Sequence, residues 1–163
     1  MKPNNTGNLP IKRKTRISDR PPVAVCLKHQ LLLPICVEVV EEFKTSGLIP
    51  AGRICIQSAV NPKNKLWLDA PLLKEALIDL LEDAVKCCDI RERIVLSVSS
   101  TGMHCCRCII SYLHQKDKNE SHEDRFEMRY YSRDRTREIV AQHQAGMNLM
   151  RDGRNVMIEL SFP

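Results

Sequence analysis

Two carboxylates, Asp79 and Asp83, stand one helical turn apart in the most regularly patterned stretch of the chain, LWLDAPLLKEALIDLLEDAVKCC. Residues at i and i+4 leave a helix on the same side, so the two side chains are expected to lie together. Carboxylate oxygens are acceptable Mg²⁺ ligands, which makes the pair a candidate metal site. The alternative is a solvated acidic helix face, because both residues lie at the edge of the expected apolar stripe.

The segment HCCRC is a second candidate, because zinc prefers thiolate and imidazole ligands. Adjacent strand residues point to opposite faces, so Cys105 and Cys106 cannot easily share an ion, whereas Cys106 and Cys108 could. A second pair of ligands would have to come from Cys87 or Cys88. We favour free thiols that act as small core residues, since the spacing of the eight cysteines is too irregular for a disulfide framework.

Catalysis by a side-chain nucleophile is not indicated. No serine, cysteine or histidine has a nucleophile-and-base arrangement that spacing alone reveals. His143 falls near the end of an expected helix, where an imidazolium is favourable. We therefore expect a structural histidine at this position.

Periodicity and capping residues give the elements that must position these side chains. Asp69 before Pro71 is typical of a helix start, Pro34 marks the first turn of an earlier helix, and Gly102 predicts a hairpin. The expected elements are a helix at residues 33–45, strands at 53–60 and 66–68, a helix that begins after Asp69, strands at 93–100 and 106–114, a polar loop at 115–126, a helix at 134–143 and a strand at 155–163. This order predicts an α/β (α+β) two-layer sandwich, a mixed and mainly antiparallel sheet with about three helices on one face.

The distribution of charge divides the sequence into a basic N-terminal leader and the rest of the chain. The chain has 163 residues, of which 43% are hydrophobic, and this is enough for one domain. Residues 1–20 hold six basic side chains and one acidic one, a net charge of +5, which equals the charge of the whole chain. We expect residues 1–22 to be a disordered basic leader and residues 23–163 to form the domain. No run is long enough to cross a bilayer and no signal pattern is present, so we expect a cytoplasmic protein.

Three stretches resemble the ATP-binding domain of sensor histidine kinases, the GHKL or Bergerat fold. LWLDAPLLKEALIDLLEDAVK is similar to the family's entry strand, aspartate-proline cap and N-box helix. RIVLSVSS and CRCIISYL resemble the next two strands, and REIVAQHQAGMNLMRDGRNVMIELSFP resembles the closing helix and final strand. The resemblance spans residues 33–163. It implies that Asp83 replaces the magnesium-binding asparagine, that Asp79 replaces its polar or general-base neighbour, and that Lys86 lies beside the nucleotide.

The chain departs from the family where the nucleotide binds. Tyr112 or His114 stands where an aspartate reads the adenine amino group, and Asp134 and Thr136 occupy the glycine turn that cradles the phosphates. A lost hydrogen bond costs roughly 1 to 3 kcal/mol, and an aspartate near phosphate costs about 1 kcal/mol or more. Since about 1.4 kcal/mol is tenfold in affinity, a few such changes move micromolar binding beyond millimolar.

These departures predict a catalytically silent kinase-type domain, a pseudokinase of two-component or phosphorelay signalling that needs no cofactor. Its implied partner is a kinase dimerisation hairpin or a response regulator, and a homodimer stays open. One alternative is a residual ATP and Mg²⁺ binder with kinase activity, either a sensor kinase fragment or an anti-sigma serine-kinase relative. Another is a nucleic-acid-associated protein that uses its basic tail, which we do not favour because no aromatic residue interleaves the basic ones. A membrane partner is not expected.

Overall fold

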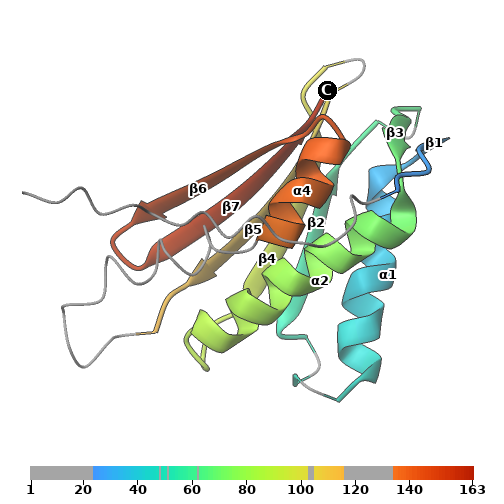
Figure 1. The fold of residues 1–163 in the computed structure, drawn as a ribbon. Coiled ribbons are helices and arrows are strands. Elements are labelled where there is room, and N and C mark those ends of the chain that lie inside the picture. Colours follow the sequence, from blue (N-terminus) through green and yellow to red (C-terminus); the bar gives the residue numbers. More distant parts are fainter. Residues whose placement is uncertain (1–23, 48, 51, 62, 103–104, 116–133) are drawn as a thin grey trace, which may run out of the picture.

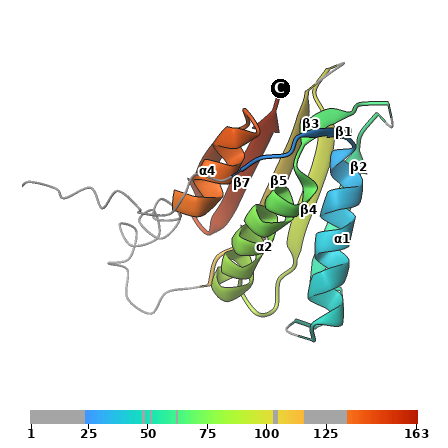
Figure 2. The ribbon, with the colours of Figure 1, turned by 45° about the vertical axis from the view of Figure 1, so that its right-hand side comes forward.

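The fold consists of two layers (Figure 1). A computed structural model describes residues 24–47, 49–50, 52–61, 63–102, 105–115 and 134–163. The strands and helices are β1 (Lys28–Gln30), α1 (Leu32–Thr45), β2 (Ile54–Ala59), β3 (Leu66–Leu68), α2 (Ala70–Cys87), β4 (Ile94–Ser100), β5 (Cys106–Leu113), α4 (Asp134–Gln142), β6 (Gly146–Asp152) and β7 (Asn155–Phe162). The three helices lie on one face of the larger sheet, with α2 between α1 and α4 (Figures 1 and 2).

The larger sheet is mixed and mainly antiparallel, as the sequence predicts. Its strand order is β2-β4-β5-β7-β6, and only β2 and β4 run parallel to each other. A parallel pair needs a crossover, which β3 and α2 provide. The expected hairpin between β4 and β5 is present, with Ser100 opposite Cys106. A separate small sheet joins β1 to β3 in antiparallel register.

Helix α2 forms where the sequence predicts it. The Asp69 carboxylate accepts a hydrogen bond from the backbone N–H of Leu72 at 3.2 Å, and Pro71 lies in the first turn. One stripe of the helix is buried against the sheet and comprises Leu73, Ala76, Leu77, Leu80, Leu81 and Ala84. This stripe leaves the acidic residues of α2 outside the core.

Helix α1 also agrees with its sequence signals to within one residue. Pro34 lies in its first turn, as expected, and Gly47 adopts a φ of 68° just after its end, a conformation that favours glycine. No helix of the described residues is long and apolar enough to cross a membrane. The expected leader and most of the expected polar loop fall at residues 1–23 and 116–133, outside the part of the chain that the structure describes.

Two strands were absent from the sequence prediction, β1 and β6. Strand β1 has three residues, too few for a two-residue period to stand out. Strand β6 pairs with β7 over its whole length, and Gly153 turns the chain between them at a φ of 56°. The Asp152-Gly153 pair is a hairpin signal that could have revealed β6.

Truncation of the α2 stripe should destabilise the whole domain. Leu77 is fully buried, so Leu77→Ala should lower the free energy of unfolding by about 2 to 5 kcal/mol in a urea titration. Ile90 is 78% exposed, so Ile90→Ala should change it by less than about 0.5 kcal/mol. Equal effects of the two substitutions would contradict this placement of the core.

Candidate functional site

The acidic side of α2 is in contact with the first turn of α4. The Thr136 hydroxyl donates a hydrogen bond to Oδ2 of Asp79 at 3.1 Å, and Thr136 is fully buried. Beside it, Nε of Arg135 donates to Oε1 of Glu75 at 3.0 Å, which raises the pKa of the guanidinium. The space between α2 and α4 is therefore occupied at this level by side chains of the two helices.

Asp83 lies one turn further along α2 than Asp79, and both carboxylates are half-buried. The expectation that the two share one side of a continuous helix is confirmed, because α2 runs unbroken from Ala70 to Cys87. Within the described ranges, no group of three or more His, Cys, Asp or Glu side chains is arranged to hold a metal ion. A magnesium role for Asp83 stays a prediction.

Asp134 and Thr136 belong to helix α4 itself. Asp134 is the first residue of α4 and is exposed, and Thr136 lies in the first turn. The positive end of the helix dipole stabilises a carboxylate at this place. The resemblance puts these residues in a glycine-type turn before the helix, whereas the residues that directly precede α4 lie outside the described chain. Their role toward phosphate stays a prediction.

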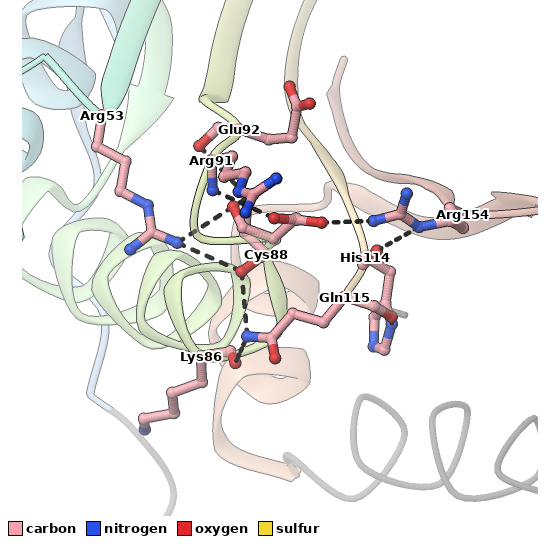
Figure 3. Close-up of polar contacts among 9 residues, drawn as sticks. Arg53, Lys86, Cys88, Arg91, Glu92, His114, Gln115 and Arg154 are labelled. Carbon is pink, nitrogen blue, oxygen red and sulfur yellow. Dashed lines mark hydrogen bonds and ion pairs between the residues drawn. The ribbon is translucent and has the colours of Figure 1, made fainter. Parts of the chain in front are cut away.

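The end of β5, where the family's adenine-reading aspartate is expected, is tied to the β6–β7 hairpin. Tyr112 is buried near the end of the strand, and His114 is buried just beyond it. The backbone N–H of His114 donates to the Arg154 carbonyl at 2.8 Å, and Nε of Arg154 donates back to the His114 carbonyl at 2.9 Å. These bonds fix the backbone at His114 (Figure 3).

Gln115 fastens the same segment to the C-terminal end of α2 (Figure 3). Its side-chain amide donates to the carbonyls of Lys86 and Cys88, each at 3.1 Å. The guanidinium of Arg53 donates to the Cys88 carbonyl at 3.3 Å. These donors satisfy carbonyl groups that a helix end leaves without intrahelical partners. The Lys86 ammonium group points away from these contacts (Figure 3) and forms a weak ion pair with Glu82 at 3.5 Å.

Asp89, just after α2, completes this polar cluster. Its Oδ1 accepts from the backbone N–H of Arg91 at 3.2 Å, and its Oδ2 accepts from the Arg154 guanidinium at 2.7 Å. Both bonds favour the ionised form, so they lower the pKa of Asp89. Burial raises the pKa of the neighbouring Cys88 thiol. Sequence spacing gives no signal for this cluster, because its members come from four separate parts of the chain: Arg53, residues 86–91, residues 114–115 and Arg154.

His143 holds the end of α4 against the start of α2. Its Nδ1 donates to the Ile139 carbonyl at 2.7 Å, and its Nε2 accepts from the backbone N–H of Asp69 at 3.0 Å. The structural role predicted for His143 is confirmed. The expected imidazolium is wrong in this geometry, because a ring nitrogen that accepts a hydrogen bond carries no proton.

The cysteine cluster divides between core and surface. Cys106 and Cys108 are buried and Cys105 is exposed, as strand alternation predicts. The sulfur of Cys108 contacts that of Cys36 at 4.0 Å rather than Cys87 or Cys88. This contact and burial raise the pKa of Cys108 well above its ordinary value, so the thiol stays protonated. The interpretation of these residues as small core groups is confirmed for Cys36, Cys106 and Cys108.

This chain is similar to known proteins in its fold. No protein-family model matches the sequence, and no curated protein matches it. The catalytic domain of histidine kinase ThkA superposes with a TM-score of 0.65 at 14% identity, covering 85% of this chain and 96% of that one. The chain has the fold of a histidine kinase catalytic domain. The resemblance seen in the sequence is thereby confirmed at the level of architecture.

Two further structures agree with this assignment. The kinase domain of the Escherichia coli osmosensor EnvZ gives a TM-score of 0.59 at 12% identity, covering 90% of this chain and 91% of that one. Full-length ShkA, solved in complex with AMPPNP, gives 0.62 at 15% identity, covering 88% of this chain and 32% of that one. This chain therefore spans about a third of ShkA and nearly all of the EnvZ domain.

The contact between α2 and α4 should be measurable as an energetic coupling. Thr136→Val removes the hydroxyl and keeps the shape, so it should lower the free energy of unfolding by about 1 kcal/mol. In a double-mutant cycle with Asp79→Ala, the two effects should be non-additive by roughly 0.5 kcal/mol or more. Additive effects would show that the hydroxyl and the carboxylate do not interact.

Asp89 should make stability sensitive to acid. Its folded pKa is lowered, so its contribution is fully present above the ordinary aspartate pKa and is lost as the pH falls through the lower folded value. Asp89→Asn should therefore destabilise the domain near neutral pH, and the difference from the wild type should vanish in acid. Urea titrations over a pH series measure this, with the exposed Asp152→Asn as the control. A difference that stays constant with pH would refute it.

Proposed function

We propose that the chain is a catalytically silent histidine-kinase-like domain that acts in two-component or phosphorelay signalling through protein contact, without bound ATP. The observation that carries this proposal is the hydrogen bond between the buried Thr136 hydroxyl and Asp79. By the resemblance, Asp79 and the start of α4 are the parts that would face the phosphates and Mg²⁺. In this chain they face each other.

Electrostatics at this end of α4 also supports the proposal. Asp134 places a carboxylate at the helix N-terminus, where a phosphate would otherwise meet free amides. The nearby guanidinium of Arg135, a group well suited to phosphate, is held by Glu75 at 3.0 Å. A bound triphosphate would therefore have to displace two side-chain contacts and lie beside an unneutralised acid. The residues present do not fit a family-type MgATP site.

The adenine end supports the same conclusion. His114 and Gln115 use their backbone and side-chain groups to join β5 to the end of α2 and to the β6–β7 hairpin. An adenine site needs an unengaged carboxylate here, whereas the two candidates for that position, Tyr112 and His114, carry no carboxylate and are buried in the fold. Recognition of the adenine amino group by these residues would require the segment to rearrange.

A domain of this fold that does not bind nucleotide can still act by binding another protein. The fold is that of domains from histidine kinases, so we propose a kinase dimerisation hairpin or a response regulator as the partner. The outer surface of the helical layer suits a polar contact, because ion pairs such as Lys74–Glu38 and Lys44–Glu41 cover it. The alternative of residual ATP and Mg²⁺ binding rests on the half-buried Asp79 and Asp83 and on the fold shared with ShkA, which was solved with AMPPNP.

Thermal unfolding in the presence of ATP and Mg²⁺ tests the proposal. We expect no shift of the midpoint up to millimolar nucleotide, whereas a ligand at about 1,000 times its Kd stabilises a protein by about 4 kcal/mol. A saturable shift that requires Mg²⁺ and disappears in Asp83→Ala would establish the alternative. Asp152→Ala is the matched control, since it removes an exposed carboxylate at the β6–β7 turn.

A further inference from the structure

Strand β2 forms an open edge of the larger sheet. It is the first strand in the order β2-β4-β5-β7-β6, so within the described part of the chain it pairs with β4 alone. The backbone N–H of Ile94 on β4 donates to the Arg53 carbonyl at 2.9 Å, and a parallel pair uses the N–H and C=O groups of every second residue. The backbone groups of Ile54, Ile56 and Ser58 therefore point outward, away from β4.

This edge lacks the features that protect an edge strand in soluble proteins. Ile54–Ala59 reads ICIQSA and contains no charged residue and no proline. Arg53, directly before it, turns inward and donates to the Cys88 carbonyl at 3.3 Å. The opposite edge strand, β6, ends in the charged residues Arg151 and Asp152. An unprotected edge pairs readily with another extended strand, so β2 is suited to pairing between chains.

Helix α1 continues this edge with an apolar flank. It is the outermost helix (Figure 2), and the ion pair of Glu38 with Lys74 marks the flank that faces α2. At 3.6 residues per turn, Val37 and Glu38 lie on opposite sides of the buried stripe of α1, and Leu33 lies one turn before Val37 on the same flank. Val37 is 39% exposed. Apolar groups of α1 and outward backbone groups of β2 thus lie along one side of the domain.

We infer that two copies of the chain pair through β2 in an antiparallel, two-fold symmetric dimer. This pairing puts Ile56 at the symmetry axis and Ile54 opposite the partner's Ser58. The outward N–H and C=O groups of each copy then meet those of the other, as in an ordinary antiparallel ladder. No like charges face each other, because the strand is uncharged. Such a contact uses the same surface on both copies and closes on itself. The inference is independent of the signalling role proposed above.

The spacing of the helices fits this arrangement. Helix α1 packs on both β2 and β4, so its axis lies between them, about 2.4 Å inside β2 for strands about 4.8 Å apart. The symmetry axis lies about 2.4 Å outside β2, halfway to the partner's strand. The two α1 helices are then about 10 Å apart, within the range of about 8 to 10 Å at which helices pack. Leu33 and Val37 of each copy fill the contact between them.

Helix and strand also match in length. Helix α1 has 14 residues, or about 21 Å, and β2 has six, or about 20 Å. They run past each other in opposite directions (Figure 1), so Val37 and Ile56, each near the middle of its element, lie at a similar level. A strip about 20 Å long and about 20 Å deep buries roughly 400 Å² on each copy, the size of a weak interface. We therefore expect dimerisation in the micromolar range.

Sedimentation equilibrium of the full chain, kept reduced, measures this association between about 5 and about 500 μM. The wild type should pass from monomer to dimer within this range. Val37→Glu opposes two like charges at the helix contact and should raise the dissociation constant at least about tenfold. Met157→Glu is the matched control, because Met157 is equally exposed at 39% but lies on β7, three strands away from β2. It should leave the association unchanged.

Ser58→Pro tests the backbone pairing. The N–H of Ser58 is not used toward β4, so a proline is tolerated on this edge, but its ring blocks the approach of a second strand. The variant should remain monomeric at about 500 μM while its far-UV circular dichroism stays that of the wild type. If Ser58→Pro does not fold, Val37→Glu still decides the question.

Amide hydrogen exchange tests the same pairing without a substitution. Protection of the Ile56 and Ser58 amides should rise with protein concentration, because only the dimer gives them partners. Protection of the Cys55 and Gln57 amides, which face β4 in monomer and dimer alike, should change much less.

Three results would overturn the inference. The first is a wild type that stays monomeric at about 500 μM. The second is a dimer that Val37→Glu leaves unchanged or that Met157→Glu weakens as strongly. The third is protection of the Ile56 and Ser58 amides that does not depend on concentration, since the chain itself would then cover the edge.

Discussion

The contact between Asp79 on α2 and Thr136 on α4 is the constraint on which the functional argument depends. A buried hydroxyl must find a hydrogen-bond partner, and among the described residues Thr136 finds it in the Asp79 carboxylate. Separation of the two helices would leave that hydroxyl unsatisfied and would also break the Arg135–Glu75 pair. Helices α2 and α4 are thus fastened to each other, and the docking role proposed above would gain from that rigidity.

Both ends of α2 are fixed by other residues, which keeps this contact in place. At the start, Asp69 caps the helix and its backbone N–H reaches His143, so α2 and α4 also meet there. At the end, Arg53 and Gln115 satisfy carbonyls of the last turn. These bonds join α2 to β5 and to the strand edge. The helix that carries the candidate site is consequently held at both of its ends.

Sequence reasoning succeeded where local signals are strong. Helix α2 has a capping aspartate, a proline in its first turn and a long apolar stripe, and this stripe packs against one face of the sheet. It failed for β1, whose three residues carry no period, and for β6, whose hairpin signal is the Asp152-Gly153 turn at its end. The contacts that matter for function could not be predicted from spacing at all. Thr136 and Asp79 are 57 positions apart and His143 and Asp69 are 74, so only the fold brings them together.

Charged side chains are unevenly distributed over the chain. Acidic side chains gather on the helical layer, whereas the leader and the β1–β3 sheet are basic.

An NMR titration of the isotope-labelled full chain with ATP and Mg²⁺ tests the central claim most directly, because it observes both helices residue by residue. If α2 and α4 are fastened as described, the amide signals of Asp79, Asp83, Arg135 and Thr136 will not move as nucleotide reaches millimolar concentration. Saturable, magnesium-dependent shifts confined to these residues would contradict the account.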